Sequence, residues 1–384
     1  MKKYRILRIV STMNPEKGGV VEAIKSMSKP LSLVDVSTDV LSFDDPNESW
    51  VKNSEVEIIA IGRSYSAYSI NFAYPKWLKD NCQKYDLVVF DGLWQFLSLG
   101  WIILKQRNIP YFVFVHGMLD PYFNKNLLKY LKKLPFWYCI EKLMLNNARS
   151  VIYTSVLEKE LADNSFPGLN ATTNICCLGV SDSAYKEYKS MQSKKFNSDI
   201  LISNRKYALF LSRVHQKKGI DLLIKAVSKV KLPEDFVFVI AGPDTDGLRG
   251  RLKSLAVEFN VESKFIWLDM VTGAEKWHLY QRCDFFVLPS HQENFGIVVA
   301  EALMCSAPVL ITDKINIFNE IAEFNAGIIA VDTVQGVETL INSWFSLNSD
   351  DRYKMRENAR RCYENNFGEH ACAERFRKII EERL

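Results

Sequence analysis

Short runs of apolar, β-branched and aromatic residues alternate along the chain with stretches whose apolar residues recur every three or four positions. The first pattern predicts buried strands and the second predicts amphipathic helices. Strands that alternate with helices form parallel sheets covered by helices, so the chain is predicted to be an α/β protein. The strands expected in the first half span residues 5–11, 37–43, 56–61, 86–91, 111–116, 150–154 and 174–178. Those expected in the second half span residues 207–212, 236–241, 264–268, 284–288, 308–312 and 327–330.

The length and composition predict two domains. The chain has 384 residues, of which 48% are hydrophobic and 12% aromatic, enough for two substantial cores. Residues 183–205 are polar, rich in Lys and Ser, and show little periodicity, so they contain the expected linker. The predicted boundaries are 1–185 for the first domain, 186–205 for the linker, 206–365 for the second domain and 366–384 for a C-terminal helix.

One segment of the second domain combines a strand, a loop and a helix with two carboxylates. Residues 289–303 read PSHQENFGIVVAEAL, and the apolar positions predict a helix that begins near Phe295. A helix that follows such a loop directs free backbone N–H groups at an anion. Glu293 lies in the loop and Glu301 lies about two turns down the helix, so they can hold different parts of an elongated ligand. In the alternative interpretation Glu293 is a solvated loop residue and Glu301 is favoured only by the helix dipole.

Two cations follow the first strand of the same domain. Arg213 and Lys218 lie between strand 207–212 and a helical stretch, and Gly219 follows Lys218 directly. Such cations can neutralise a diphosphate, Arg through its planar fork and Lys as a point charge. Both could instead be ordinary loop cations, and Lys217 is interpreted as a solvated charge.

These two segments resemble the Glu-x7-Glu and Arg-x4-Lys-Gly motifs of retaining glycosyltransferases of group 1 (family 4-like). The resemblance covers nearly the whole chain and is strongest over residues 207–312. It implies the GT-B architecture, in which two Rossmann-like parallel-sheet domains face each other across a cleft. It also implies transfer of a hexose-type sugar from a UDP- or GDP-linked donor to a glycan or a polyprenyl- or other lipid-linked acceptor. Such enzymes act in bacterial-type polysaccharide, lipopolysaccharide or glycolipid biosynthesis.

The resemblance also implies roles for residues of the second domain. Arg213 and Lys218 would stabilise the leaving diphosphate, and Glu293 would position the donor sugar without acting as a covalent nucleophile. Glu301 would hold the ribose hydroxyls. The remaining residues expected to bind the donor in this domain are Met270, Asn294, Phe295, Gly296 and Ile297.

The first domain supplies further candidates. Gly18 and Gly19 follow the first strand and match the family's glycine loop, which contacts donor and acceptor; there is no Gly-x-Gly-x-x-Gly sequence, so a nicotinamide cofactor is not expected. His116 ends strand 111–116, where α/β proteins place ligands, and the resemblance makes it a catalytic residue beside the donor sugar. A lone histidine is more often structural. Asp120 is a weaker candidate on the acceptor side, because an aspartate before Pro121 is equally a turn residue.

Three further features qualify the resemblance. Asp269 stands where relatives often carry Gly, which leaves the donor preference open. Asp244 and Asp246 resemble an Asp-x-Asp metal site, but the segment is better suited to starting a helix with Asp246 as its cap. No metal and no cofactor other than the nucleotide sugar are therefore expected. The C-terminal helix is expected to pack on the first domain by resemblance alone.

The overall charge is mild but unevenly distributed. A net charge of +4 and a pI of about 8.4 do not call for nucleic acid. Residues 101–150, however, hold eight Lys or Arg against two acidic residues, and residues 126–138 mix cations with large apolar side chains. That mixture is typical of a surface that contacts anionic lipid. A solvated helix face with a buried apolar side explains it equally well.

The cysteines and the hydropathy pattern predict a cytoplasmic protein. The eight cysteines contain no Cys-x-x-Cys spacing, so zinc sites and disulfides are not expected. Scattered, unpaired cysteines are typical of proteins in a reducing compartment. The basic start has too short an apolar run for a signal peptide, and no run of 18 apolar residues predicts a membrane span. If the basic segment contacts lipid, the protein is expected at the inner face of the membrane.

Three alternative functions remain open at this level. A nucleotide-sugar epimerase would share the fold and the charged residues. A non-catalytic nucleotide-sugar-binding partner subunit would be expected to lose the charged set, which is present here. A sugar phosphorylase would need a pyridoxal-binding lysine, and no motif for one is found. The sequence does not identify the base or the sugar of the donor, or the acceptor.

Overall fold

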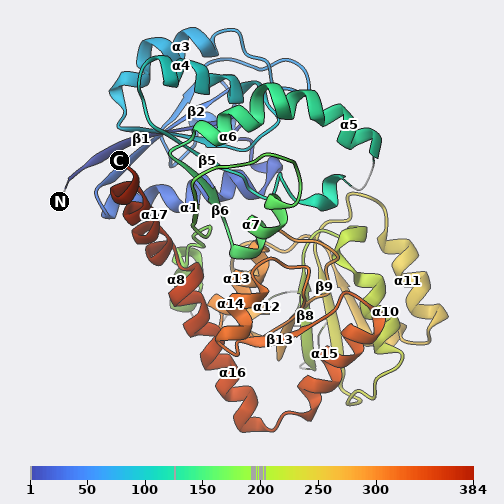
Figure 1. The fold of residues 1–384 in the computed structure, drawn as a ribbon. Coiled ribbons are helices and arrows are strands. Elements are labelled where there is room, and N and C mark those ends of the chain that lie inside the picture. Colours follow the sequence, from blue (N-terminus) through green and yellow to red (C-terminus); the bar gives the residue numbers. More distant parts are fainter. Residues whose placement is uncertain (1, 125–126, 192–195, 197, 199–201, 203–204) are drawn as a thin grey trace. The chain divides into compact units, whose positions relative to one another are not determined.

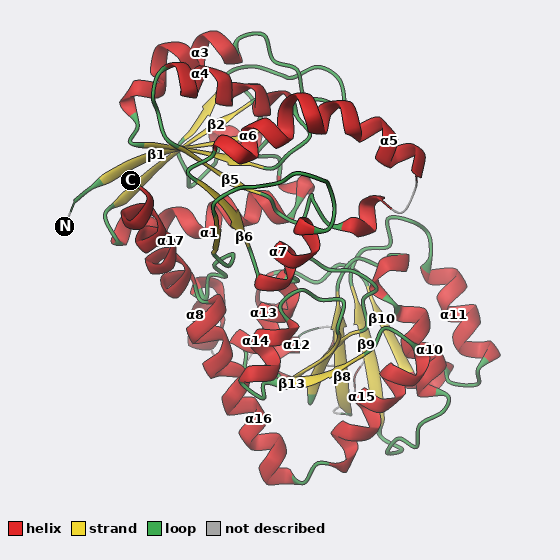
Figure 2. Ribbon diagram, in the orientation of Figure 1, coloured by secondary structure: helices red, strands yellow, loops and turns green. Residues whose placement is uncertain are grey.

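The structure, a computed structural model, describes residues 2–124, 127–191, 196, 198, 202 and 205–384. The chain divides into two compact units (Figure 1). Unit 1 comprises Met1–Gly179 and Glu369–Leu384, and unit 2 comprises Val180–Gly368. Each unit contains one parallel sheet with helices packed against it (Figure 2).

The sheet of unit 1 has the strand order β3-β2-β1-β4-β5-β6-β7, and every neighbouring pair is parallel. The order reverses between β1 and β4, so the loops after these strands diverge at a topological switch point, where α/β proteins bind ligands. The strands are β1 (Tyr4–Val10), β2 (Val36–Ser42), β3 (Ile58–Ala60), β4 (Leu87–Asp91), β5 (Tyr111–Phe114), β6 (Ser150–Tyr153) and β7 (Thr173–Ile175).

The sheet of unit 2 repeats this plan with the order β10-β9-β8-β11-β12-β13, again all parallel, and its switch point lies between β8 and β11. The strands are β8 (Lys206–Leu211), β9 (Phe236–Ala241), β10 (Phe265–Leu268), β11 (Phe285–Leu288), β12 (Val309–Thr312) and β13 (Gly327–Ala330). All the predicted strands are confirmed, each starting within two residues of its predicted position. The prediction of two Rossmann-like parallel-sheet domains is therefore confirmed.

Helices lie between successive strands in both units, and three more follow the last strand. Those of unit 1 are α1 (Gly19–Leu33), α2 (Ser49–Lys52), α3 (Tyr74–Asn81), α4 (Gly100–Gln106), α5 (Leu127–Phe136), α6 (Lys142–Asn147), α7 (Val156–Asp163) and α17 (Glu369–Arg383). Those of unit 2 are α8 (Ser183–Ser190), α10 (Ile220–Val227), α11 (Arg249–Glu258), α12 (Gly273–Arg282), α13 (Ile297–Met304), α14 (Phe318–Glu323), α15 (Val334–Ser346) and α16 (Ser349–Cys362).

The C-terminal helix α17 belongs to unit 1, where it packs against α1. Phe376 contacts the rings of Phe112 and Phe114 on β5, with centroids 6.2 and 5.7 Å away. Arg377 is buried, and its guanidinium donates to the carbonyls of Lys2 and Val34. Apolar packing and a satisfied buried cation thus hold the end of the chain on unit 1.

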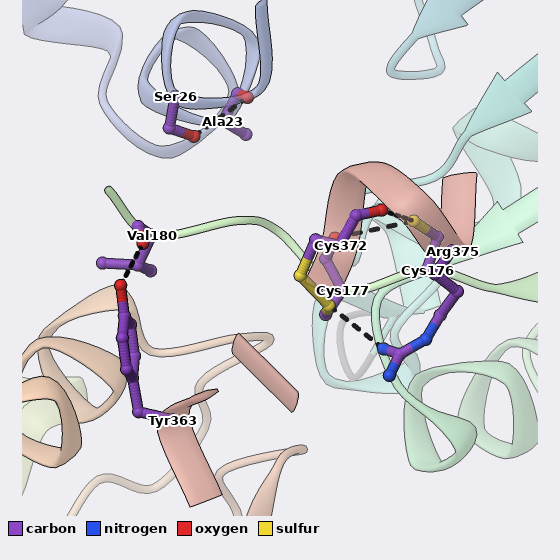
Figure 3. The surroundings of a disulfide bond; sticks show 8 residues. All are labelled: Ala23, Ser26, Cys176, Cys177, Val180, Tyr363, Cys372 and Arg375. Carbon is purple, nitrogen blue, oxygen red and sulfur yellow. Dashed lines mark hydrogen bonds between the residues drawn. A yellow bond between two sulfur atoms is a disulfide. The ribbon is translucent and has the colours of Figure 1, made fainter. Parts of the chain in front are cut away.

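A disulfide joins Cys177 to Cys372, so the expectation that no cysteine is paired is wrong (Figure 3). The partners are 195 residues apart, and only the return of α17 to unit 1 brings their Cα atoms within 5.9 Å. Cys177 comes just before the chain enters unit 2 and Cys372 just after it leaves, so the closed loop contains all of unit 2. Arg375 lies beside the pair, 3.2 Å from the Cys177 Sγ. The remaining six cysteines are free.

The start of the predicted linker is helical. Helix α8 occupies Ser183–Ser190, where little periodicity was expected, because Tyr185 is buried and packs on Trp277 of α12. Much of the remaining segment, 191–205, lies outside the described residues.

Helix α5 ends shortly after Pro135, as expected from the missing N–H of proline. The chain continues as a π-helical turn, η5 (Trp137–Glu141), and then as α6. Leu127, Leu128 and Leu131 of α5 are half or more exposed. Within the described ranges, no helix combines the length and the hydropathy needed to span a membrane.

Glu141 is a buried carboxyl group that holds the loop after β4. It accepts hydrogen bonds from the backbone N–H of Trp94 at 2.8 Å and from the hydroxyl of Ser98 at 3.1 Å. Burial raises the pKa of Glu141 from 4.5 to about 7, although these two hydrogen bonds oppose the shift.

We expect the variant Glu141→Gln to lose a pH dependence of stability that the wild type shows. Because the folded pKa is raised, the contribution of Glu141 is fully present below pH 4.5 and is lost as the pH rises through about 7. Between pH 5 and 8 the free energy of unfolding of the wild type should therefore fall by roughly 2–4 kcal/mol relative to that of the variant. Urea unfolding at both pH values measures this. The exposed-site variant Glu55→Gln is the control, and parallel profiles for wild type and Glu141→Gln would contradict the assignment.

Candidate active site

The loops after β8 and β11 lie side by side at the switch point of unit 2. Gly219 has a φ of +67°, and a Cβ there would come within 1.9 Å of the carbonyl oxygen of Pro289, so only glycine allows this approach. The backbone N–H of His291 donates to the carbonyl of Lys217 at 2.8 Å. The basic segment and the acidic segment singled out in the sequence are therefore joined through their backbones.

Lys218 and Glu293 form an ion pair across this junction. Their side chains are only 13% and 23% exposed, so the pair is partly shielded from water. Arg213 is exposed in the same loop and forms no ion pair with any described residue. Lys217 points elsewhere and donates to the side chain of Gln292 at 2.9 Å. One cation is thus held by a carboxylate while a second stays available to an anion.

Helix α13 begins beside Glu293. Gly296 is the residue before the helix, lies in the left-handed region with a φ of +71°, and provides no side-chain cap. The first-turn N–H groups after Phe295, including that of Ile297, are therefore donors at the positive end of the helix dipole. Asn294 is fixed by Asn316, whose side-chain amide donates to it at 3.3 Å. The helix starts two residues later than predicted, but in the predicted relation to Glu293.

Glu301 is nearly buried on α13 and is tied to α12. It forms an ion pair with Lys276 at 2.6 Å and accepts a hydrogen bond from the hydroxyl of Tyr280 at 3.1 Å. Burial and the nearby Glu301 hold the pKa of Tyr280 well above its usual value, so this tyrosine stays a donor. Met270, in the loop after β10, is exposed. Sequence reasoning missed Lys276 and Tyr280, whose spacing of four residues on a helix was the available signal.

Asp269, which departs from the family pattern, pairs with Arg249 at 2.5 Å. The N-cap residue of α11 is Leu248, and the carboxylate of Asp244 accepts from the backbone N–H groups of Leu248 and Arg249 at this start of the helix. The prediction that Asp246 is the cap is therefore wrong.

In unit 1, His116 is held by a buried charge cluster. Its Nε2 lies 2.8 Å from Asp91 Oδ1, and Arg8 of β1 binds the same carboxylate with two nitrogens, one at 2.8 Å. The three side chains are at most 4% exposed. Burial acts to raise the pKa of Asp91, but Arg8 and His116 outweigh it and the pKa is lowered. His116 has a φ of +50° and its ring stacks on Phe114. Sequence reasoning missed Arg8 and Asp91, which are 83 residues apart.

The other candidates of unit 1 differ in accessibility. Gly18 has a φ of +74° and precedes α1, and a Cβ on Gly18 or Gly19 would meet nothing within 4 Å. Asp120 is nearly buried and accepts a hydrogen bond from the backbone N–H of Tyr122 at 2.8 Å. It therefore holds a turn in this structure. The structure thus gathers Lys218, Glu293 and the start of α13 in unit 2.

The comparisons with known proteins agree with the geometry. Residues 192–362 match the family model described as "Glycosyl transferases group 1". The chain is 23% identical over 378 residues to the uncharacterized glycosyltransferase MJ1178 of Methanocaldococcus jannaschii, with 96% of this chain and 95% of that protein covered. It is 35% identical over 109 residues to a second protein of that organism, the uncharacterized glycosyltransferase MJ1607, with 28% of this chain and only 27% of that protein covered.

Two solved structures show the same fold. A glycosyltransferase from Rickettsia africae has a TM-score of 0.78 and 19% identity, with 100% of this chain and 99% of that chain covered. HepE from Anabaena, in complex with UDP and glucose, has a TM-score of 0.73 and 17% identity, with coverages of 99% and 100%. The chain therefore has the GT-B fold of these glycosyltransferases, and the family model that it matches covers most of unit 2.

Proposed function

We propose that the protein is a retaining, metal-independent glycosyltransferase that moves a hexose-type sugar from a UDP- or GDP-linked donor to a glycan or lipid-linked acceptor. One observation carries the proposal. The ion pair of Lys218 and Glu293 lies at the switch point of unit 2, beside Arg213, which pairs with none of the described residues, and the start of α13, which has no side-chain cap. This arrangement suits a ligand with a diphosphate at one end and a hydroxyl-rich sugar at the other.

The chemistry follows from the charges already in place. As the bond between the sugar and the diphosphate breaks, negative charge grows on the leaving phosphate oxygen. Arg213, Lys218 and the first N–H groups of α13 stabilise that charge without moving far. Glu293 accepts hydrogen bonds from the donor sugar, and the acceptor hydroxyl enters on the face that the diphosphate leaves. The anomeric configuration is thereby retained without a covalent intermediate.

Glu301 is proposed to hold the ribose hydroxyls. A carboxylate can accept from two vicinal hydroxyls, and such charged hydrogen bonds contribute about 1.5–3 kcal/mol each. Lys276 and Tyr280 fix the orientation of the carboxylate before the donor arrives. Met270, Asn294, Phe295 and Gly296 complete the proposed donor site of unit 2.

Unit 1 is proposed to supply the reacting side of the sugar and the acceptor. Asp91 binds His116 through Nε2, so Arg8 and Asp91 act as positioning residues for it. Gly18 and Gly19 leave room for the ligand at the end of β1. Asp120 is proposed to contribute to the acceptor side by holding the turn before Tyr122.

A nucleotide-sugar donor is supported by HepE, whose structures are named as complexes with UDP and with UDP-glucose. The test is a thermal-shift screen with UDP, GDP, ADP and their sugar conjugates, since a ligand of the folded state raises its stability. Proton NMR of the product formed with the selected donor, in EDTA, then reports the anomeric configuration. Absence of any shift, an inverted product, or loss of activity in EDTA would each refute the corresponding part of the proposal.

An epimerase acting on a nucleotide sugar is the alternative that shares this site. The products distinguish the two, because an epimerase changes the donor sugar without an acceptor whereas a transferase needs one. Binding of the donor without any turnover would instead favour the non-catalytic partner subunit.

Contact with an anionic membrane through residues 101–150 is a further part of the proposal, which would place the protein at the inner face of the membrane. It is supported by α5, where exposed Leu127, Leu128 and Leu131 lie next to exposed Lys132. The protein should float with vesicles that contain anionic lipid but not with neutral ones. Leu127→Gln/Leu128→Gln should lose this property and Leu33→Gln, at an exposed leucine of α1, should keep it. Equal recovery in the soluble fraction with both vesicle types would end the proposal.

A further inference from the structure

A cavity of about 680 Å³ opens at the carboxyl edge of the sheet of unit 1. It lies at the ends of β1, β2 and β4, and therefore includes the switch point of this sheet. Its volume is within the range of roughly 300–1,000 Å³ that is typical of small-molecule sites. The residues that line it all belong to unit 1.

The wall of this cavity is rich in groups that bind hydroxyls. Ser64, Ser66 and Ser69 line one side, from the loop that follows β3. Serine hydroxyls donate and accept, so they can match the hydroxyls of a sugar in either direction. Val20 and Phe43 supply apolar surface of the kind that packs against the C–H groups of a sugar ring.

The charges of the wall are predominantly negative. Four carboxylates line the cavity (Asp44, Asp45, Glu48 and Asp91), of which Asp91 is already paired with Arg8, whereas Arg63 is the one cation among the lining residues. Asp44 is held in place by Thr12, whose hydroxyl donates to it at 2.6 Å, and by the backbone N–H of Met13 at 2.7 Å. Its carboxylate therefore stays fixed at the wall.

Arg63 does not make the cavity an anion site, because two carboxylates already hold it. It lies 3.0 Å from Glu48 and 3.5 Å from Asp45, and its side chain is 70% exposed. The three side chains together keep one negative charge. A phosphate group brought to this wall would have to compete with Asp45 and Glu48 for Arg63. It would also meet their carboxylates at close range and be repelled by them.

Resting on the proposed function, we infer that this cavity binds the acceptor and selects an uncharged, polyhydroxylated glycan end against a phosphorylated one. Asp45 and Glu48 are the residues that set this selectivity. Neutral hydroxyls donate to their carboxylates, while the same carboxylates keep Arg63 from binding a phosphate.

Ligand-detected NMR tests the inference without requiring turnover. The full chain is saturated with the nucleoside diphosphate that the thermal-shift screen selects, which keeps anionic probes out of the donor site. The probes are maltose, lactose and cellobiose, each compared with its 6′-phosphate. The wild type should bind the neutral member of a pair at least tenfold more tightly, and Asp45→Asn/Glu48→Gln should reduce that preference at least tenfold by releasing Arg63.

The variant Glu55→Gln/Glu57→Gln removes the same charge from exposed positions of unit 1 and should keep the wild-type preference. Equal or tighter binding of the phosphates, an unchanged preference in Asp45→Asn/Glu48→Gln, or binding of neither probe class would overturn the inference. Those failures would leave diphosphate binding intact. Failure of the nucleotide screen itself would instead count against the proposed function.

Discussion

Replacing Lys218 by Ala is expected to lower kcat/KM by about 10²–10³-fold, or about 2.7–4 kcal/mol of transition-state stabilisation. Lys218 is partly shielded, at the switch point, and its charge is already oriented by Glu293. In the variant the leaving diphosphate loses this cation, and Glu293 is left near the growing negative charge without its partner. The measurement is initial-rate kinetics with the donor that the binding screen selects. Most of the loss should appear in kcat, because the charge develops mainly in the transition state.

Lys217→Ala is the matched control for this variant. Lys217 is adjacent in sequence, carries the same charge and bonds to Gln292 rather than to Glu293. It should therefore keep kcat/KM within about threefold of the wild type, because a screened charge that does not touch the donor contributes little. Arg213→Ala should resemble Lys218→Ala, since the two cations share the diphosphate. Equal kinetics for the Lys217 and Lys218 variants would remove the assignment.

The fold was predictable because its signal is local. The inner strands are buried on both faces, so a run such as Phe236–Ala241 reads as continuously apolar, and its bounds are recovered without error. The neighbouring loops of unit 2 also followed from local information. Parallel strands end at one edge of the sheet, so Lys218 after β8 and Glu293 after β11 had to lie on the same side. Gly219 then allows their loops to meet.

Tertiary partners were not predictable, because no local pattern encodes them. Cys177 and Cys372 lack any spacing motif and meet only because α17 returns to unit 1. Lys276 reaches Glu301 through the packing of α12 on α13. Asp246 was the expected cap, but the carboxylate of Asp244 is the one that accepts from backbone N–H groups at the start of α11.

Arg8 shows the same limit most clearly. In the sequence it is a charge that interrupts the apolar run of the first strand, and no role was predicted for it. In the structure it lies inside β1 and binds Asp91 at the end of the adjacent strand β4. Since Asp91 also contacts His116, Arg8 is linked through Asp91 to the candidate catalytic histidine, although it breaks the hydrophobic pattern of the strand.

Replacing Arg8 by Ala is accordingly expected to lower the free energy of unfolding by about 3–5 kcal/mol, because it leaves a buried carboxylate without its main counter-ion. The lowered pKa of Asp91 gives the sign of the pH dependence. A carboxyl group whose pKa is lower in the folded than in the unfolded protein stabilises the folded state at any pH above its unfolded pKa, which is about 4 for Asp. This contribution is lost as the pH falls through the pKa of the folded state. Urea unfolding at pH 7 and pH 3 should therefore show a larger difference between wild type and variant at pH 7.

Arg5 provides the control on the same strand, because it pairs with Asp39 at 2.8 Å but is 52% exposed. Solvent screens this pair, so Arg5→Ala should lower the free energy of unfolding by less than about 1 kcal/mol. If Arg8→Ala costs no more than Arg5→Ala, the cluster does not stabilise unit 1. Arg8→Ala should also move the pH profile of kcat, because Asp91 without Arg8 interacts differently with His116. A folded Arg8 variant with an unchanged profile would show that the cluster supports the fold without positioning the histidine.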